Sequence, residues 1–345
     1  MSARPTPARS LRLARGITLI EVMVSLTLAG LLIAGAVTVY SDSSKSYAVH
    51  ETASRLEENA RYAWSVMEPD IRMASFWGLT KGSAGIVNAA AQTAAAATAL
   101  AGAAATACGT NYGVDLATTL EGSNDAYTLG CAAYNNRPMP TSDTLTVRRA
   151  SYLPTSVAAG TVGPLRICST RLSATLVNVA NNATTCPAAP TGAVNDLVVH
   201  AYYVDKDSST AANLPTLYRK SLNTTPTFAD EEILPGVEDM QVQFGIDPTG
   251  TTGIVTQYVD AVNAATLPAT AQIIAVRIWL LLRADSIETG FTDNRTYAYG
   301  NRTLAAGTVA SLLTGGAARK AYAPRDGYRR LLVSRTIMIR NALGT

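Results

Sequence analysis

The segment Arg15-Gly16-Ile17-Thr18-Leu19-Ile20-Glu21 joins a short basic leader to a long apolar run. The leader contains no acidic residue and four arginines: Arg4, Arg9, Arg12 and Arg15. With residues 22–40, the apolar span reaches about 20 residues, which as a helix would be about 30 Å long and could cross a bilayer. Because lysine and arginine stay on the cytoplasmic side, we expect the leader to face the cytoplasm and the chain after Tyr40 to face outward.

Glu21 is the only charged residue in the apolar span. A lone carboxylate in a membrane helix costs about 2.5 to 3.5 kcal/mol on insertion scales, so its presence indicates a partner. If the chain is cut after Gly16, the new α-amino group of Ile17 lies four residues before Glu21. A subunit whose Glu21 meets the Ile17 ammonium of a packed neighbour would bury two opposite charges together, which offsets much of their desolvation. An ordinary signal anchor, the alternative interpretation, gives this carboxylate no role.

The segment resembles the processing site of type IV prepilins and pseudopilins, with a basic leader, a glycine, a hydrophobic first residue, a nearby glutamate and a long apolar continuation. The resemblance implies that a membrane-embedded aspartyl peptidase, the prepilin peptidase, cuts between Gly16 and Ile17 and then methylates the amino group of Ile17. It also implies that Glu21 acts in subunit assembly. Ile17 stands where this family usually has phenylalanine, a change that should slow the cut or leave it unchanged.

The chain has 345 residues and a formal net charge of +3, and four of the positive charges lie in the leader. The part after the cut is therefore close to neutral, which argues against a nucleic-acid binder. We expect four segments: the leader (1–16), a transmembrane helix (17–40), an amphipathic helix with its connection (41–78) and a β-rich globular domain (79–345). Within that domain, residues 83–107 are rich in Ala, Thr and Gly and carry no charge, which predicts a loop or an irregular insertion.

Four cysteines in an exported chain predict disulfides. They allow three pairings, of which we favour the two local ones, Cys108 with Cys131 and Cys168 with Cys186. In the chain-entropy model each local bridge would contribute about 3 kcal/mol. Free structural cysteines are the alternative, and the spacing contains no CxxC pair typical of a zinc site.

Residues 41–67 are polar but contain neither glycine nor proline. An apolar stripe recurs among them in steps of four and three: Val49, Ala53, Leu56, Ala60, Ala63 and Met67. We therefore expect the membrane helix to continue as an amphipathic helix that packs on the globular domain. Pro69 should end or kink it near Glu68, because proline removes a backbone donor and disfavours helix in the residue before it.

From residue 141 onward the periodicity is that of strands. Short segments rich in β-branched and aromatic residues occur at 144–151, 166–169, 176–179, 196–204 and 217–222. Over 240–246, large apolar residues alternate with Gln and Gly, which predicts one buried face. Residues 272–283 are apolar on both faces and predict a central strand covered on each side. The fold class is therefore α+β, a long N-terminal helix packed on an antiparallel β-sheet domain.

Several blocks resemble the PilW family of minor pilins: 56–63 (LEENARYA), 70–78 (DIRMASFWG), 236–239 (GVED), 275–283 (AVRIWLLLR) and the closing Arg-Asn at 340–341. The resemblance implies a type IV pilin-like fold. It also implies a non-enzymatic minor pilin in the complex that primes type IV pilus assembly or caps the pilus tip, and so supports twitching motility and adhesion. A minor pseudopilin of a type II secretion system is the alternative.

The same resemblance names the expected partners: other minor pilins, the major pilin, a PilY-type tip adhesin and the prepilin peptidase. It places the precursor in the inner membrane as a single-pass protein with its N-terminus in the cytoplasm. After assembly, the chain is expected at the pilus tip or in the fibre, with the globular domain periplasmic or extracellular.

Catalytic patterns are nearly missing from the sequence, so we expect no enzymatic activity, no cofactor and no metal. His50-Glu51 begins a metalloprotease-like pattern, but Ser54 stands where a second histidine is needed. Residues 205–209 alternate oxygen-bearing side chains as in a calcium loop, but the glycine and the final glutamate of such a loop are replaced by threonines. A membrane-anchored hydrolase or a sugar-binding module would need a convergent polar site, which the sequence does not indicate.

Overall fold

The computed structural model describes residues 16–82, 86, 108–109, 111–155, 165–178, 191–223, 227–262, 266–268, 270–301 and 324–342. The chain divides into two compact units, Met1–Thr52 and Ala53–Thr345. One helix, α1 (Leu19–Arg72), begins in the first unit and ends in the second. Its 54 residues combine the predicted membrane helix and the predicted amphipathic helix.

The first unit consists, in its described part, of residues 16–18 and the first part of α1, which is apolar up to Tyr40 and polar over residues 41–52. Several of its hydroxyl side chains donate to carbonyl groups one turn earlier in the same helix, as Ser25 Oγ does to Glu21 O (2.7 Å) and Thr38 Oγ1 does to Gly35 O (2.8 Å). These bonds satisfy the hydroxyl groups locally. The outer surface of the helix is therefore left to its aliphatic side chains.

From Ala53 onward, α1 is amphipathic, and its buried residues are Leu56, Ala60, Ala63, Trp64, Met67, Asp70 and Ile71. The predicted stripe is confirmed from Leu56 to Met67, whereas Ala53 is exposed. The predicted end of the helix near Glu68 is wrong, because α1 continues through Pro69 to Arg72.

The position of Pro69 explains why the helix continues. Proline at this position deprives only the carbonyl of Ser65 of its helical donor, and both residues are exposed, so water can take the place of the missing N–H. The last turn is also held from outside the helix, because the backbone N–H of Arg340 donates to the carbonyl of Arg72 (3.2 Å).

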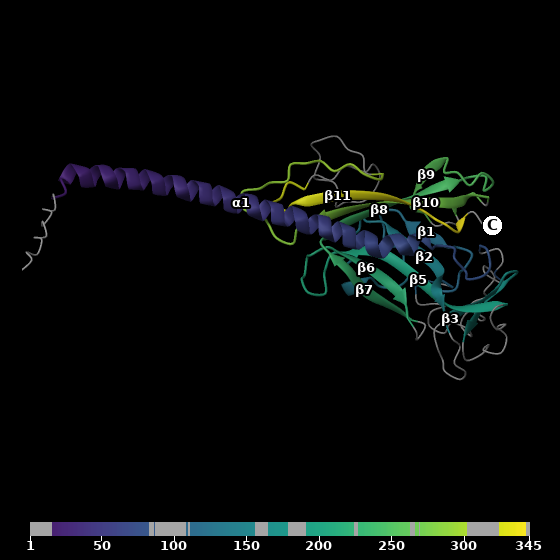
Figure 1. The fold of residues 1–345 in the computed structure, drawn as a ribbon. Helices are drawn as coiled ribbons and strands as arrows, with labels where there is room; N and C mark the ends of the chain where they lie inside the picture. The colour runs from purple at the N-terminus through teal and green to yellow at the C-terminus, as the bar shows by residue number, and fades with distance from the viewer. Residues whose placement is uncertain are drawn as a thin grey trace, which may run out of the picture. The chain divides into compact units, whose positions relative to one another are not determined.

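The second unit contains two antiparallel sheets where the sequence analysis predicted one sheet domain (Figure 1). The seven-stranded sheet has the order β1-β2-β5-β3-β4, with β6 paired to β5 and β7 to β6. Its strands are β1 (Leu120–Ser123), β2 (Thr144–Pro154), β3 (Leu165–Thr170), β4 (Ala174–Asn178), β5 (Gly192–Asp205), β6 (Thr216–Leu222) and β7 (Phe228–Pro235). A short 3-10 helix, η2 (Tyr134–Asn136), precedes β2.

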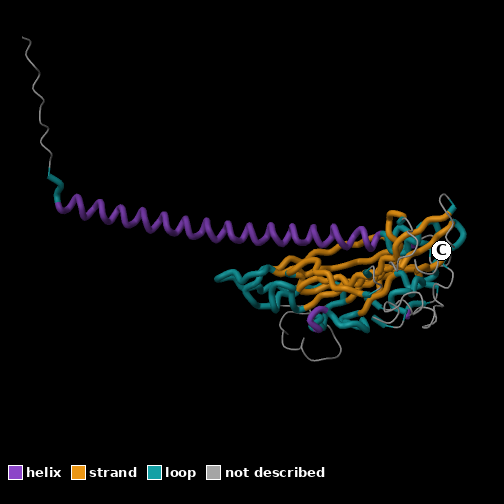
Figure 2. The backbone as a smooth tube through the Cα atoms, turned by 90° about the horizontal axis from the view of Figure 1, so that it is seen from below, coloured by secondary structure: helices purple, strands orange, loops and turns teal. Residues whose placement is uncertain are grey.

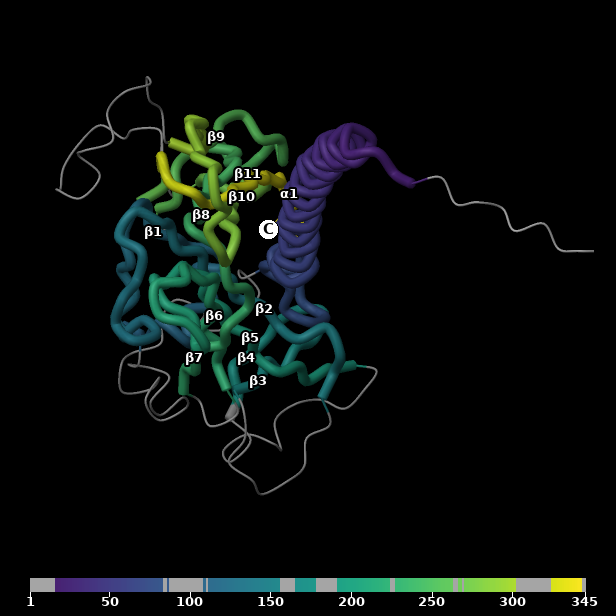
Figure 3. The backbone as a smooth tube through the Cα atoms, turned by 90° about the vertical axis from the view of Figure 1, so that its left-hand side faces the viewer, coloured from purple at the N-terminus to yellow at the C-terminus, as the bar shows by residue number. Residues whose placement is uncertain are grey.

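The four-stranded sheet has the order β11-β10-β8-β9. Its strands are β8 (Val237–Asp247), β9 (Gln257–Asp260), β10 (Gln272–Arg283) and β11 (Arg330–Met338). In the second unit, the strands gather beside the last turns of α1 (Figure 2). Viewed from one end, the two sheets lie next to each other, and the last part of α1 lies along the junction between them (Figure 3). The predicted α+β class is confirmed.

The main hydrophobic core lies at this junction and consists of side chains from α1 and from both sheets. The alternating residues of β8 contribute four fully buried side chains to it: Met240, Val242, Phe244 and Ile246. On β10, Val276 pairs with Phe244 of β8 on one side and with Ile337 of β11 on the other. The opposite face of β10 is covered as well, because Leu281 packs with Tyr297 and Tyr299. The prediction of a central strand covered on both faces is therefore confirmed.

A second core lies on the other face of the seven-stranded sheet. It contains Trp77, which is completely buried just after α1, and Cys108, which is bonded to Cys131. Around these residues pack Leu165, Ile167 and other side chains of β3 and β5. The end of α1 and the segment that follows it are thus packed on opposite faces of one sheet.

Candidate functional site: the processing segment and the end of the long helix

Gly16, Ile17 and Thr18 form an exposed, non-helical start to the described chain, and Ile17 is 76% exposed. The backbone N–H of Glu21 donates to the carbonyl of Thr18 (3.1 Å), which places Glu21 in the first turn of α1. A carboxylate at this end of a helix is favoured by the helix dipole by about 0.3 to 1 kcal/mol. The bond predicted to be cut, between Gly16 and Ile17, therefore lies on exposed chain directly before the helix. The leader arginines fall outside the described residues.

The large apolar side chains of residues 17–40 are exposed, from 43% for Val22 to 78% for Leu19. By length and composition, α1 is able to cross a membrane. A continuous apolar surface of this extent is compatible with lipid or with the apolar faces of other helices rather than with water. This half of the helix therefore has the surface of a membrane anchor.

At the other end of α1, Asp70 is buried beneath the helix with 4% of its surface exposed. Its Oδ1 atom accepts a hydrogen bond from Arg149 Nε of β2 (2.7 Å). Its Oδ2 atom lies 2.7 Å from His200 Nδ1 and accepts from the Tyr202 hydroxyl (2.8 Å), both on β5. One helical carboxylate is therefore bound by three side chains from two neighbouring strands.

The electrostatics of this cluster favour the ionised carboxylate. Burial by itself would raise the pKa of Asp70, but the hydrogen bond and charge of His200, together with those of Arg149, lower it to about 2. Burial raises the pKa of Tyr202 well above its ordinary value, and the charge of Asp70 raises it further, so this hydroxyl remains a donor. The cluster fixes the end of the helix to the sheet by charge as well as by packing.

This cluster was not predicted. In the sequence analysis, Asp70 appears only as part of the family-like block 70–78. A weak signal exists, because His200 and Tyr202 are two residues apart and so share one face of a strand. Nothing in the local sequence indicates that Asp70, 130 residues earlier, lies opposite that face.

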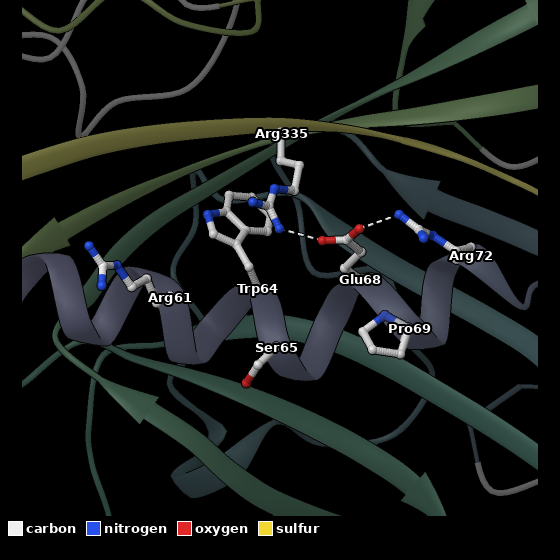
Figure 4. A pocket seen from close by; sticks show the side chains of 7 residues that line it. All are labelled: Arg61, Trp64, Ser65, Glu68, Pro69, Arg72 and Arg335. Carbon is white, nitrogen blue, oxygen red and sulfur yellow. Dashed lines mark hydrogen bonds and ion pairs between the residues drawn. The ribbon is translucent and has the colours of Figure 1, made fainter.

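A groove of about 400 Å³ lies on the outer side of this helix end, between α1 and β11 (Figure 4). Glu68 stands in it and is bonded by Arg72, one turn later on the helix, and by Arg335 from β11. The guanidinium of Arg335 also lies 5.6 Å from the centre of the Trp64 ring. Arg61, Ser65 and Pro69 also line the groove. The groove thus joins cationic side chains to an apolar wall.

The C-terminal blocks of the sequence meet in a buried charge network. The Arg330 side chain is completely buried and donates to Glu238 Oε2 (2.5 Å) and to Asp326 Oδ1 (2.6 Å). The hydrogen bond and the charge of Arg330 outweigh burial, which by itself would raise the pKa, and leave the pKa of Asp326 below its usual value. Next to Glu238, Asp239 accepts a hydrogen bond from the Tyr299 hydroxyl (2.6 Å). The structure therefore brings the GVED block and the start of the last strand together.

The predicted disulfide between Cys108 and Cys131 is confirmed, with a Cα–Cα distance of 4.3 Å. Cys168 lies on β3, whereas its predicted partner Cys186 lies outside the described residues, so that pairing stays a prediction. Of the Ala-rich insertion 83–107, only Ile86 is described.

The calcium-like loop uses its carboxylates within the protein. Asp207 accepts two hydrogen bonds from Arg137 Nη1 (2.8 Å each), and burial raises the pKa of neighbouring Asp205 to about 6. His50 is exposed on α1, and His200 lies beside Asp70. In the part of the chain that the structure describes, no group of three or more His, Cys, Asp or Glu side chains is arranged to hold a metal ion.

Two protein-family models match the chain. The model described as "Prokaryotic N-terminal methylation motif" matches residues 11–37, and the model described as "Type IV Pilus-assembly protein W" matches residues 201–341. Among solved structures, a type IV-like pilin from Thermus thermophilus is similar, with 17% identity over 61% of this chain and 82% of that chain and a TM-score of 0.27. No curated protein matches the chain.

The first match covers the processing segment, and the second covers the strands from within β5 to β11. The family-like blocks 236–239, 275–283 and 340–341 lie inside the second match, whereas 56–63 and 70–78 lie outside it. The two ends of one chain therefore match an N-terminal methylation motif and a pilus-assembly family, respectively.

Proposed function

Because this chain is a PilW-like type IV pilin, we propose that it is a non-enzymatic subunit of the complex that primes a type IV pilus or caps its tip. The observation that carries the proposal is the presence of both matches on one chain, the methylation motif over 11–37 and the pilus-assembly model over 201–341. In this role the prepilin peptidase cuts between Gly16 and Ile17 and methylates Ile17. Other minor pilins, the major pilin and a PilY-type tip adhesin are the partners that we propose.

The role proposed for Glu21 follows from its surroundings. Among the described residues, Glu21 makes no ion pair, and it lies at the start of an apolar helix. In lipid, such a carboxylate is tolerated when a positive charge meets it. We propose that the Ile17 ammonium of a neighbouring subunit supplies this charge and that the pair sets the register of assembly. The globular unit then faces the periplasm or the exterior, where it contacts other subunits.

Mass spectrometry of the N-terminus tests the processing step directly. We expect the assembled protein to begin with N-methylated Ile17. A chain that keeps its basic leader, or that loses the whole apolar span, would contradict this proposal.

Deletion of the gene tests the pilus role. Loss of surface pili and of twitching motility is the expected result, and complementation with the wild-type chain should restore both. Intact pili combined with stalled protein secretion would instead identify a pseudopilin of a type II secretion system.

The variant Glu21→Val tests the charge pair. It should still be inserted and processed, because the span becomes more apolar, but it should enter fibres poorly. The control is Ser25→Val, which changes a polar residue one turn later without removing a charge and should assemble normally. Normal incorporation of Glu21→Val would refute the role of the carboxylate.

A further inference from the structure

The groove between α1 and β11 has more positive than negative charge. Three arginines line it, Arg61, Arg72 and Arg335, together with one acid, Glu68. Glu68 is contacted by both Arg72 and Arg335, so one carboxylate is shared by two guanidinium groups. Within the described part of the chain, Arg61 has no carboxylate partner. The lining therefore carries a net charge of about +2, counted from ionised side chains.

The arginines keep donors available for a ligand. Arg72 and Arg335 each bond Glu68 through one terminal nitrogen, and their side chains remain 42% and 46% exposed. A guanidinium has five N–H donors in a planar fork, so each arginine retains donors after binding Glu68. These free donors can form bidentate pairs with a carboxylate, in which two N–H groups donate to its two oxygens.

The apolar part of the lining favours a side chain over a bare ion. Trp64 is 7% exposed and carries the Arg335 guanidinium on its ring, and Pro69 lies one helical turn further along. These groups offer an apolar wall to the methylene groups of an acidic side chain, while the arginines receive its carboxylate. A space of about 400 Å³ accommodates a short peptide segment rather than one carboxylate.

We propose that this groove binds an acidic peptide segment of a neighbouring pilus subunit, with its carboxylates paired to Arg61 and to the free donors of Arg72 and Arg335. The charge complementarity and the apolar wall select this occupant over a neutral segment. The proposal deepens the proposed function, because it names the chemistry of one contact between subunits. It rests on surroundings that are separate from Glu21 and from the processing site.

The binding test uses the full chain in neutral detergent micelles with a fluorescence readout. The chain has three tryptophans, so we would work in a Trp279→Phe background, in which Trp64 reports from the groove and Trp77 is fully buried. The probe is a capped synthetic peptide of alternating Glu and Ala, and the control probe replaces every Glu by Gln. We expect the emission of Trp64 to change when the Glu peptide is added but not when the Gln peptide is added. The affinity for the Glu peptide should fall as the salt concentration rises.

Three variants separate the groove from general electrostatics. Arg61→Glu should weaken binding at least tenfold, whereas Arg61→Lys should keep most of it. Arg55→Glu reverses an exposed charge on the same helix outside the groove and should leave binding within about twofold. Because Arg61 and Arg55 are both exposed, each variant should unfold within about 0.5 kcal/mol of the wild type.

Several results would overturn the proposal. If the Gln peptide binds as tightly as the Glu peptide, carboxylates are not what the site recognises. If Arg61→Glu and Arg55→Glu lose the same affinity, the groove is not the binding site. A change in Trp64 emission on doping the micelles with anionic lipid, dependent on Arg61 and larger than that given by the peptide, would assign the site to lipid instead.

The same variants in cells distinguish this proposal from the proposed function. Arg61→Glu should be processed to Ile17 as usual but should lower the number of surface pili, and Arg55→Glu should not. If deletion of the gene abolishes pili while Arg61→Glu leaves them at the wild-type number, the groove proposal fails and the pilus role stands. If deletion leaves pili intact, the pilus role fails, and peptide binding by the purified chain still decides whether the groove is a site for acidic segments.

Discussion

Replacing Asp70 by asparagine tests how strongly the buried charge cluster holds the end of the long helix. The side chains have nearly the same shape, so packing is preserved while the charge is removed. The pKa of Asp70 falls from 3.8 to about 2 in the folded protein, a change that corresponds to about 2 kcal/mol of stability. Asparagine also leaves Arg149 without its carboxylate partner, and loss of one partner of a buried pair costs about 3 to 5 kcal/mol in fully buried cases. Because Arg149 is 16% exposed, we expect a loss of about 2 to 3 kcal/mol at neutral pH.

The pH dependence provides a second signature with a definite sign. A carboxylate whose pKa is lower in the folded state stabilises the protein above the unfolded pKa, which is about 3.9 for aspartate. This contribution is lost as the pH falls toward the folded pKa of about 2. The difference in unfolding free energy between wild type and Asp70→Asn should therefore be complete at pH 5 and should shrink between pH 4 and pH 2.

The assay is urea unfolding of the full chain in neutral detergent micelles, followed by near-UV circular dichroism. The matched control is Asp285→Asn, since Asp285 is 68% exposed and its ion pair with Arg55 spans 3.9 Å. This control should change stability by less than about 0.5 kcal/mol. The reasoning fails if Asp70→Asn is as stable as the wild type at pH 7, or if the difference is as large at pH 2.5 as at pH 7.

Other changes in the second unit have expected outcomes of the same kind. Gly236→Ala should lower the free energy of unfolding by about 2 kcal/mol or more, because Gly236 has φ +86° and a Cβ there would lie 2.7 Å from the Arg283 carbonyl oxygen. The control is Gly290→Ala, which has φ +82° but no atom within 4 Å of the added Cβ. It should cost less free energy in the same urea titration. Replacing Cys108 and Cys131 together by serine should lower the free energy of unfolding by about 3 kcal/mol, and non-reducing peptide mapping of the wild type should find these two cysteines linked. The same mapping should link Cys168 to Cys186, and any crossed pairing would refute the local assignment. Pro69→Ala should raise the thermal midpoint, because it restores an N–H donor for the Ser65 carbonyl in a helix that already continues to Arg72.

The sequence predicted those parts of the fold that depend on local periodicity. A period of two places Met240, Val242 and Phe244 on one face of β8, and the structure buries all three. The same alternation cannot say which strands pair, because pairing depends on contacts far apart in the chain. β10 lies beside β11, and Val276 meets Ile337 across more than 50 residues. The division into two sheets depends on such contacts and was therefore not predictable from single strands.

The error at Pro69 has a related cause. Proline weakens a helix locally, and the prediction considered only this local effect. In the structure, the last turn receives hydrogen bonds from residues far away in sequence, from Arg149 to Asp70 and from Arg340 to the carbonyl of Arg72. Tertiary contacts of this kind outweigh the loss of one helical bond on an exposed face.

The treatment of charge differs between the two units and bears directly on assembly. In the second unit, three buried charges have opposite charges beside them in the same chain: Asp70 has Arg149, Arg148 has Glu121 and Arg330 has Glu238. Glu21 in the first unit makes no such pair among the described residues, although it is the one charged residue in the apolar span 17–40. This contrast supports the proposal that Glu21 meets its partner on another molecule. The charge pair that we propose with a neighbouring subunit therefore rests on the membrane cost of a lone carboxylate as well as on the methylation-motif match over residues 11–37.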